Sequence, residues 1–340
     1  MIYDWNKCYI ENGNQKEKDP MIKDSSSDRA SRMGSALSRK GRLTRMRAYI
    51  PLYIMLLPAL VYVMINNYLP MGGLVLAFKQ FNAGKGIFGS DWNHFANFDF
   101  LLKNRSLPLF LRNTVCYNLV FIVINMVVGV FLALAITEIR GKGMRQFSQS
   151  IILFPFVVSI IIISYMVRGF LDFNTGLFNS LLKSMGRTPV NWYMEKKYWP
   201  AILVFVNMWK SVGYGCLLYI AALLGIDPSL YEAASISGAS RLQQIWYITL
   251  PHLAPTCVTL ALLSVGHIFN SDFGLFYQVP QNSGIIASVT QTIDTFVYKS
   301  MATNVGMSAA ASFFQSAGGF VLILFFNWVA RRVSRENALF

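Results

Sequence analysis

The amino-acid sequence predicts an all-α membrane protein with six transmembrane helices and one helical loop on the cytoplasmic side. Composition is the first reason: 54% of the 340 residues are hydrophobic and 14% are charged, against roughly 25% charged in ordinary soluble domains. The second reason is a set of separate apolar stretches, each near the length of about 20 residues that crosses a bilayer as a helix. The third is the net charge of +14, whose basic residues lie mostly beside those stretches, as in membrane proteins.

The predicted spans divide the chain into a long central region and two tails. A helix of a soluble core could explain any one apolar stretch, but not six in one chain. Residues 1–47 are polar, basic and rich in serine, which predicts a disordered cytoplasmic tail. The long apolar region 48–335 follows, and residues 336–340 form a short C-terminal tail. The six spans are expected at about residues 48–69, 110–138, 149–171, 198–225, 253–276 and 308–330.

The orientation follows from Lys and Arg in the short segments next to the spans. Basic groups precede the first span and follow the second and the sixth, and an even number of spans places all three on one side. Positive charge marks the cytoplasmic side, although longer loops on the other side also carry lysines. A multi-pass protein of the cell membrane with both termini cytoplasmic is therefore expected. The groups are Arg39, Lys40, Arg42, Arg45 and Arg47, then Arg140, Lys142 and Arg145, then Arg331, Arg332 and Arg335.

The only long loop on the cytoplasmic side, about residues 226–252, has the pattern of a helix–turn–helix. Ser229 with Glu232 and Ser240 with Gln243 have the spacing of two capping boxes, each of which would begin a helix. Gly238 lies between them, where a left-handed turn costs glycine little. Leu250-Pro251 is expected to end the second helix.

This loop resembles the signature loop of permeases of ATP-binding-cassette (ABC) importers, which are binding-protein-dependent transport systems. The matching residues are Glu232-Ala233-Ala234, Gly238 and Ile248-Thr249-Leu250-Pro251, and we call residues 226–252 the EAA loop. The sequence departs from the pattern at Ser237, where such families often carry Asp. The stretch "WKSVGYGCLLYIAALLGIDPSLYEAAS" resembles the carbohydrate-uptake, maltose-type branch, and "PLYIMLLPALVYVMINNYLPMGGLVLAFKQFN" and "IDTFVYK" resemble a subgroup for oligosaccharides released from polysaccharides. Together the resemblance covers roughly residues 48–335.

The resemblance implies a coupling role for the loop and a set of partners. Part of the loop would form a coupling helix on a separate ATPase subunit, and the residues implied are Glu232, Ala233, Ala234, Gly238, Ala239, Leu250 and Pro251. The sequence contains no G-x-x-x-x-G-K-[ST] motif, so ATP and Mg are expected on that ATPase, with no cofactor, metal or catalytic residue on this chain. The implied partners are a homologous second permease, two ATPases, an extracellular solute-binding protein and a sugar.

Polar residues inside apolar spans are expensive and indicate functional positions. Asn207, Lys210 and Tyr214 share one helical face in the fourth span, and we expect this face to line a translocation path. Lys210 could instead serve packing alone, and a hydrogen-bonding role is expected for His267. Arg168 and Asp172 are spaced for a local ion pair. The complete set expected along the path is Asn118, Asn207, Lys210, Tyr214, His267, Asn270 and Asp272.

Two other functions remain open from the sequence. The same architecture could import a solute that is not a sugar. An ion-coupled secondary transporter would need carboxylates inside the membrane and often contains inverted repeats. The acidic residues in or near the spans are Glu138, Asp172 and Asp272, all close to span ends, and no repeat is evident. The pattern therefore favours an importer driven by ATP.

Overall fold

A computed structural model describes residues 49–333 of the chain, which divide into two compact units. The first unit ends at Pro70 and the second begins at Met71. The predicted tails, residues 1–47 and 336–340, lie outside the described residues. In the first unit a helix over residues 49–63 continues through the π-helical turn η1 (Met64–Tyr68), and the short helix α2 (Leu69–Met71) joins the two units.

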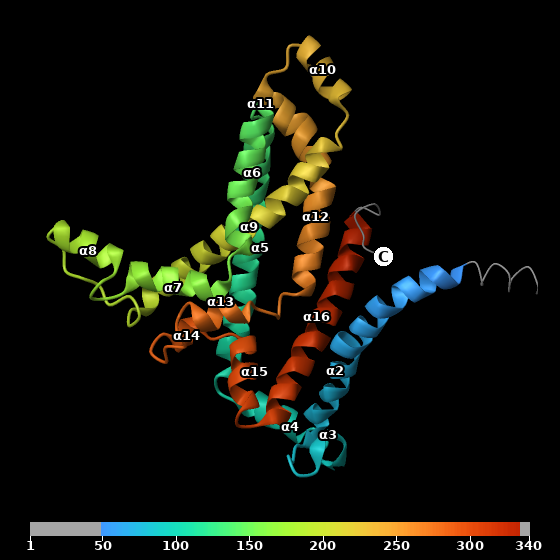
Figure 1. The fold of residues 1–340 in the computed structure, drawn as a ribbon, viewed down its shortest axis with the longest axis vertical. Helices are drawn as coiled ribbons and strands as arrows, with labels where there is room; N and C mark the ends of the chain where they lie inside the picture. The colour runs from blue at the N-terminus through green and yellow to red at the C-terminus, as the bar shows by residue number, and fades with distance from the viewer. Residues whose placement is uncertain (1–48, 334–340) are drawn as a thin grey trace, which may run out of the picture. The chain divides into compact units, whose positions relative to one another are not determined.

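The second unit consists of long apolar helices joined by short ones (Figure 1). The long helices are α5 (Leu107–Thr137), α9 (Trp199–Leu224), α12 (Leu250–Gly266) and α16 (Val305–Val333). Across residues 49–333, five helices are long and apolar enough to cross a membrane, or six if one bent pair counts as a single span. The only strands in this range are β1 (Lys79–Gln80) and β2 (Asp91–Trp92), which pair antiparallel. The prediction of an all-α membrane protein is confirmed.

Short elements connect the long helices of the second unit, and some of them lie at its end opposite the EAA loop (Figure 1). Before α5 come η2 (Gly72–Phe78), α3 (Gly86–Gly89) and α4 (Ala96–Lys103). Between α7 and α9 lie α8 (Leu177–Ser184) and η3 (Lys196–Tyr198). Before α16 come α13 (Phe273–Gln278), α14 (Ala287–Thr290) and α15 (Ile293–Met301).

The third predicted span is not one straight helix. It consists of α6 (Lys142–Val157) and α7 (Ile160–Leu171), which bend by 93° at the break between them. Pro155 lies inside α6, and a proline weakens the helix around it because it lacks a backbone donor. The Ser159 hydroxyl then accepts from the Ile161 amide at 3.4 Å and begins α7. These local signals divide a stretch that its apolar composition alone predicted as continuous.

The expected ion pair between Arg168 and Asp172 is wrong. The ion pairs in the described part of the chain are Lys85–Asp91 and Lys103–Asp99, both exposed. Asp172 instead accepts from the backbone amides of Asn174 and Thr175, each at 3.0 Å. These hydrogen bonds, together with the Thr175 hydroxyl, lower the pKa of the Asp172 carboxyl. Asp172 therefore ends α7 with a local turn that accounts for its charge.

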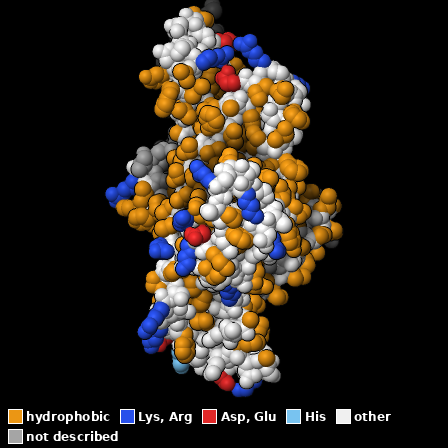
Figure 2. Space-filling view, turned by 90° about the vertical axis from the view of Figure 1, so that its left-hand side faces the viewer, with side chains coloured by type: hydrophobic (Ala, Val, Ile, Leu, Met, Phe, Trp, Pro, Cys, Tyr) orange, Lys and Arg blue, Asp and Glu red, His pale blue; other side chains and the backbone are white. Residues whose placement is uncertain are grey.

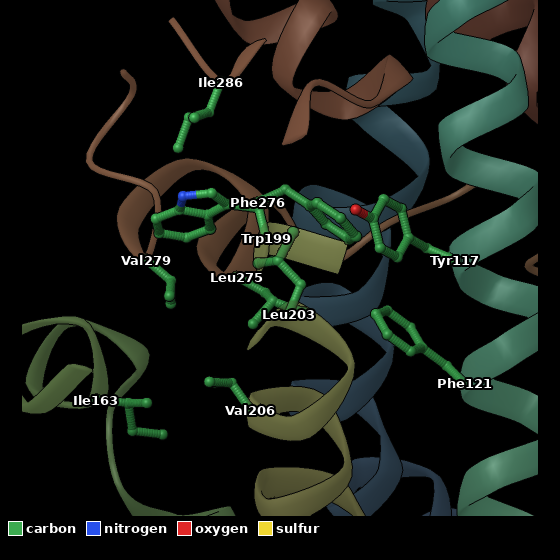
Figure 3. Packing of buried hydrophobic residues seen from close by; sticks show 10 residues of the cluster. All are labelled: Tyr117, Phe121, Ile163, Trp199, Leu203, Val206, Leu275, Phe276, Val279 and Ile286. Carbon is green, nitrogen blue, oxygen red and sulfur yellow. The ribbon is translucent and has the colours of Figure 1, made fainter. Parts of the chain in front are cut away.

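The main buried cluster lies where α5, α7, α9 and α13 meet (Figure 3). Trp199 is fully buried at the start of α9, and its indole nitrogen donates to the Trp192 carbonyl at 2.8 Å. Tyr117, Phe121 and Phe276 form aromatic contacts in the same cluster, with Tyr117 and Phe276 centroids 5.0 Å apart. This cluster fixes α5 and α9 side by side, which is the pair on which the candidate site depends.

The outward surface is largely apolar, as expected for helices in lipid. On α5, Val123, Val127 and Phe131 recur every four residues and all are exposed, so they form one stripe on the helix surface. Figure 2 shows apolar side chains over much of one face, with Lys and Arg in separate groups. Such extensive exposed apolar surface indicates contact with a membrane or other subunits rather than with water.

Candidate functional site

A cavity of about 470 Å³ lies between α5, α9 and α12 and the segment that follows α12. Asn118 lines it from α5, and Asn207 and Tyr214 line it from α9. The structure therefore gathers residues of three helices that are remote in sequence into one polar-lined hollow. Of the seven residues predicted along the path, it brings together Asn118, Asn207, Tyr214, His267, Asn270 and Asp272.

Lys210 is the predicted path residue that lies outside this lining. Its Nζ donates to the Phe156 carbonyl at 3.4 Å and lies 5.6 Å from the centroid of the Phe156 ring. Phe156 is next to last in α6, where the final carbonyls lack partners within the helix and a cation is favourable. The Phe156 ring in turn stacks on Tyr214, with centroids 5.0 Å apart. Lys210 is thus linked to the cavity-lining residue Tyr214 through the Phe156 ring.

Helical geometry explains why Lys210 is separated from its neighbours. At about 100° per residue, Ser211 and Tyr214 project within roughly 40° of Asn207, whereas Lys210 projects about 60° away on the Tyr214 side. Ser211 and Leu218 line the cavity with Asn207 and Tyr214. The sequence analysis missed Ser211, although its spacing of four from Asn207 was the available signal.

An amide pair joins the two helices across the cavity wall. The Asn125 Nδ2 group on α5 donates to Asn207 Oδ1 on α9 at 3.0 Å. The Asn125 Oδ1 atom is buried and has no hydrogen-bond partner in the described part of the chain. A buried acceptor without a partner is costly, so this atom is an unsatisfied polar group in the wall beside Asn207.

The fifth predicted span ends ten residues earlier than expected, because α12 stops at Gly266 rather than near residue 276. Non-helical backbone follows, over residues 267–272, before α13 begins at Phe273. His267, Asn270 and Asp272 belong to this break and line the cavity. Irregular backbone at membrane depth is tolerated only where protein or a watery cavity satisfies its polar groups, and side chains of other helices do so here.

Side chains from two long helices satisfy the carbonyls of this break. Asn118 Nδ2 on α5 donates to the carbonyls of Ile268 and Asn270, at 2.7 and 2.8 Å. Gln315 Nε2 on α16 donates to the Phe269 carbonyl at 2.9 Å. Asn118 therefore lines the cavity and also holds its irregular wall in place.

Carboxylates fix the far end of the break. Asp294 on α15 accepts from the Ser271 amide at 2.6 Å and from the Ser271 hydroxyl at 2.8 Å. Asp272 caps α13, because its Oδ1 accepts from the Leu275 amide at 3.1 Å. The sequence analysis missed Asp294, because its partner Ser271 lies 23 residues away and no local pattern links them.

The first helix of the EAA loop is α10 (Pro228–Ile236), and its cap differs from the prediction. Asp227 is the capping residue, and its Oδ1 accepts from the Ser229 amide at 2.9 Å. The predicted Ser229–Glu232 capping box is wrong, because Pro228 occupies the first turn and the residue before it takes the cap. Hydrogen bonds from Ser229 lower the pKa of the Asp227 carboxyl. Glu232 is exposed and free of a capping role.

The turn and the second capping box agree with the sequence. Gly238 has a φ of +81°, in the left-handed region that favours glycine. Ser240 and Gln243 form the capping box of α11 (Arg241–Gln244), with Gln243 Oε1 accepting from the Ser240 amide at 2.7 Å. The turn between the two helices is therefore fixed by backbone conformation and by local hydrogen bonds.

The second helix of the loop does not end at Leu250-Pro251 as expected. It continues from α11 through a π-helical turn, η4 (Ile245–Thr249), into α12, so that one helix extends from Arg241 to Gly266. The Leu250 amide reaches back to the Ile245 carbonyl. Pro251 follows this π-helical turn directly, so its missing donor falls where the regular hydrogen-bond pattern of the helix is already interrupted. Pro251 was expected to end the helix, but the helix instead continues past it through the wider π-helical turn.

Hydrogen bonds hold the loop together as one body. The buried Gln244 donates from Nε2 to the Ser235 hydroxyl of α10 at 2.9 Å. The hydroxyls of Tyr231 and Thr249 are hydrogen bonded at 3.0 Å. Apolar side chains nevertheless project from the loop, with Ile236 88% and Leu242 70% exposed. The predicted coupling residues lie on this body, with Glu232, Ala233, Gly238 and Pro251 exposed and Ala234, Ala239 and Leu250 half-buried.

These features define the class of protein as a multi-pass membrane transport subunit: spans enclose a polar-lined cavity, and a rigid loop with exposed apolar side chains is joined to it by one helix. The chain belongs to the family "Binding-protein-dependent transport system inner membrane component", whose sequence model matches residues 125–335. The chain is thus an inner-membrane permease component of that family.

A known protein and two solved structures similar to this chain are named for polysaccharide transport or import. "Polygalacturonan/rhamnogalacturonan transport system permease protein YteP" of Bacillus subtilis (strain 168) is 30% identical over 301 residues, covering 88% of this chain and 93% of that protein. A chain in the crystal structure of a bacterial ABC transporter involved in the import of the acidic polysaccharide alginate is 30% identical, with a TM-score of 0.77, covering 86% and 99%. In the alginate transporter complexed with an alginate pentasaccharide-bound periplasmic protein, a chain is 29% identical, with a TM-score of 0.76, covering 86% and 97%.

Proposed function

We propose that this chain is the permease subunit of an ABC importer that moves an oligosaccharide, or another sugar, delivered by an extracellular binding protein. The observation that carries the proposal is the polar cavity at one end of the helix Arg241–Gly266, whose other end is the EAA loop. The relatives named for polygalacturonan, rhamnogalacturonan and alginate support a saccharide. A non-sugar solute carried by the same machinery is the second candidate.

The cavity chemistry suits a saccharide. Its polar lining consists mainly of amides and hydroxyls, among them Asn118, Asn207, Ser211 and Tyr214. Sugar hydroxyls donate and accept hydrogen bonds, so they pair with amides that do both. Phe121 and Leu218 supply apolar wall for the ring faces of the sugar.

The proposed assembly contains a homologous second permease, two ATPases and the extracellular binding protein. ATP and Mg would bind the ATPases, and this chain would carry out no chemistry of its own. The alginate transporter bound to its periplasmic protein supports the binding-protein partner. The Lys and Arg groups next to the spans support cytoplasmic termini and a cytoplasmic EAA loop.

Movement would pass from the ATPases to the cavity through one element. The exposed side chains of Ile236 and Leu242 would dock on an ATPase, and Gln244 joins α10 to the helix that follows. That helix reaches Ser264, which lines the cavity, and ends immediately before His267. Closure of the ATPase dimer would thereby shift the cavity wall and alternate access between the two sides.

Reconstitution of the complete complex with its binding protein into liposomes tests the proposal. Uptake of labelled oligosaccharide is expected to require ATP on the side of the membrane that the ATPases face. It should continue when an uncoupler collapses the proton gradient. Uptake that persists without ATP but stops with the uncoupler would show a secondary transporter and overturn the proposal. ATP-driven uptake of only a non-sugar solute would support the second candidate.

A further inference from the structure

A second hollow lies on the α5–α9 pair, apart from the translocation cavity. It is a groove of about 260 Å³. Arg112 lies in its lining, followed along α5 by Cys116 and Val120, while Pro200 and Val204 of α9 and Val289 of α14 complete the walls. Arg112, Cys116 and Val120 are spaced by four residues and so follow one stripe of the helix for about 12 Å. The groove thus has a cation followed by an apolar channel.

The polar groups in the groove wall are engaged by the protein itself. The Tyr117 hydroxyl donates to the Val289 carbonyl at 2.7 Å. Asn113 Nδ2 donates to the carbonyls of Ser288 and Gln291, at 3.1 and 2.9 Å. These bonds leave mainly apolar surface facing the groove below Arg112. A sugar or another hydroxyl-rich ligand would find few partners there.

Arg112 is exposed and has no carboxylate partner in residues 49–333, where the ion pairs are those of Lys85 and Lys103. Its guanidinium donates to Asn113 Oδ1 at 3.3 Å, a long bond that leaves most of its donors free. The 31 residues of α5 make it roughly 46 Å long. Since the hydrocarbon core is about 30 Å thick, a centred α5 would place Arg112 near the core boundary and Val120 inside it.

We propose that this groove binds an anionic glycerophospholipid of the leaflet at the N-terminal end of α5. The phosphate pairs with the Arg112 guanidinium, which matches phosphate oxygens in a bidentate way. One acyl chain lies along Cys116 and Val120 and against Val204. Charge complementarity at the head and apolar lining at membrane depth together select a lipid over a soluble anion, which would leave the channel empty.

The native thiol of Cys116 provides the test, because it lines the groove and is free and exposed. The full chain, purified with the subunits that accompany it, is placed in nanodiscs of phosphatidylcholine alone or with added phosphatidylglycerol. N-ethylmaleimide labelling of Cys116 is followed by peptide mass spectrometry. Arg112→Gln removes the proposed phosphate partner. Arg105→Gln is the matched control, since Arg105 is exposed just before α5 and does not line the groove.

Phosphatidylglycerol is expected to slow Cys116 labelling in the wild type and in Arg105→Gln by about fivefold, the order of effect of one arginine at an anionic surface. The same lipid should give no protection in Arg112→Gln. Equal protection in all three proteins would overturn the proposal. So would a wild-type Cys116 whose labelling in detergent, where no bilayer shields the thiol, is the same with and without added phosphatidylglycerol. Unchanged labelling of Cys257 shows that each variant keeps its fold.

Discussion

At the scale of the residue, Lys210 shows how a side chain can be near a cavity without lining it. The sequence placed it on the path with Asn207 and Tyr214, but its ammonium group lies against Phe156, whose ring stacks on Tyr214. A polar residue within a span thus has two distinct uses, binding a solute or completing the end of a broken helix. The two uses predict different kinetics.

Lys210→Ala is expected to lower the maximal uptake rate several-fold while the apparent KM for the solute changes less than twofold. The physical reason is that the substitution removes the hydrogen bond to the Phe156 carbonyl at the end of α6. It removes no group that faces the cavity. Asn207→Ala, its matched control, should raise KM, because it removes a lining amide. Uptake kinetics of the reconstituted complex measure both. A large rise in KM with Lys210→Ala would show that the lysine contacts the solute.

The Asn118 side chain provides the second prediction at this scale. Asn118→Ala removes two donors from the carbonyls of Ile268 and Asn270. A buried polar group left without a partner costs ~1–3 kcal/mol, so the free energy of unfolding should fall by about that amount. Ser312→Ala is the control, because its hydroxyl bonds only to the Ser308 carbonyl one turn earlier. Denaturant unfolding in detergent measures both changes. Equal effects would contradict the conclusion that the Asn118 hydrogen bonds stabilise the break after α12.

At the scale of the element, the EAA loop separates residues that build the helix from residues available to a partner. Asp227 caps α10, and Gln244 and Thr249 join it to the following helix. Glu232 takes no part in the cap, contrary to the capping box predicted from its spacing. Effects of Glu232 on coupling therefore report on contact with a partner rather than on helix stability.

Glu232→Lys is expected to leave the helix content of the loop unchanged while lowering ATPase co-purification and solute-stimulated hydrolysis, because it reverses an exposed charge. Asp227→Ala should instead destabilise α10 by ~1 kcal/mol, the usual cost of losing such a cap. Hydrogen exchange of the α10 amides measures the second effect, and pull-down of the ATPase measures the first. Normal ATPase binding by Glu232→Lys would remove this residue from the interface.

At the scale of the whole molecule, orientation in the membrane is the property that the proposed function needs most. The EAA loop must face the ATPases, and residues 277–307 must face the opposite side. Gly143 and Gly284 offer two matched positions, because each is exposed and an added Cβ would meet no neighbouring atom within 4 Å. Cysteine at either position should therefore leave the fold unchanged.

Each cysteine is introduced into a variant of the protein in which Cys116 is replaced. In intact cells, an impermeant maleimide is expected to label Gly284→Cys and to spare Gly143→Cys. Permeabilisation should make both reactive. The physical reason is the density of Lys and Arg beside Gly143 at the start of α6. The opposite labelling pattern would show that the protein has the inverse topology, with the EAA loop outside the cell. The loop could not then contact cytoplasmic ATPases, and the proposed function would be wrong.

The sequence by itself determined the membrane class, the approximate positions of the spans and the turn at Gly238, because these depend on local composition, length and backbone preference. It also identified six of the polar residues that line the cavity, since polar side chains within apolar spans are rare. Tertiary structure decided the bend between α6 and α7, the early end of α12 and the continuous helix through Pro251. The backbone groups between α12 and α13 are hydrogen bonded by side chains from distant parts of the chain, namely Asn118, Gln315 and Asp294. Local sequence cannot show such partners, because a break in a membrane helix is stable only when packing brings them to it.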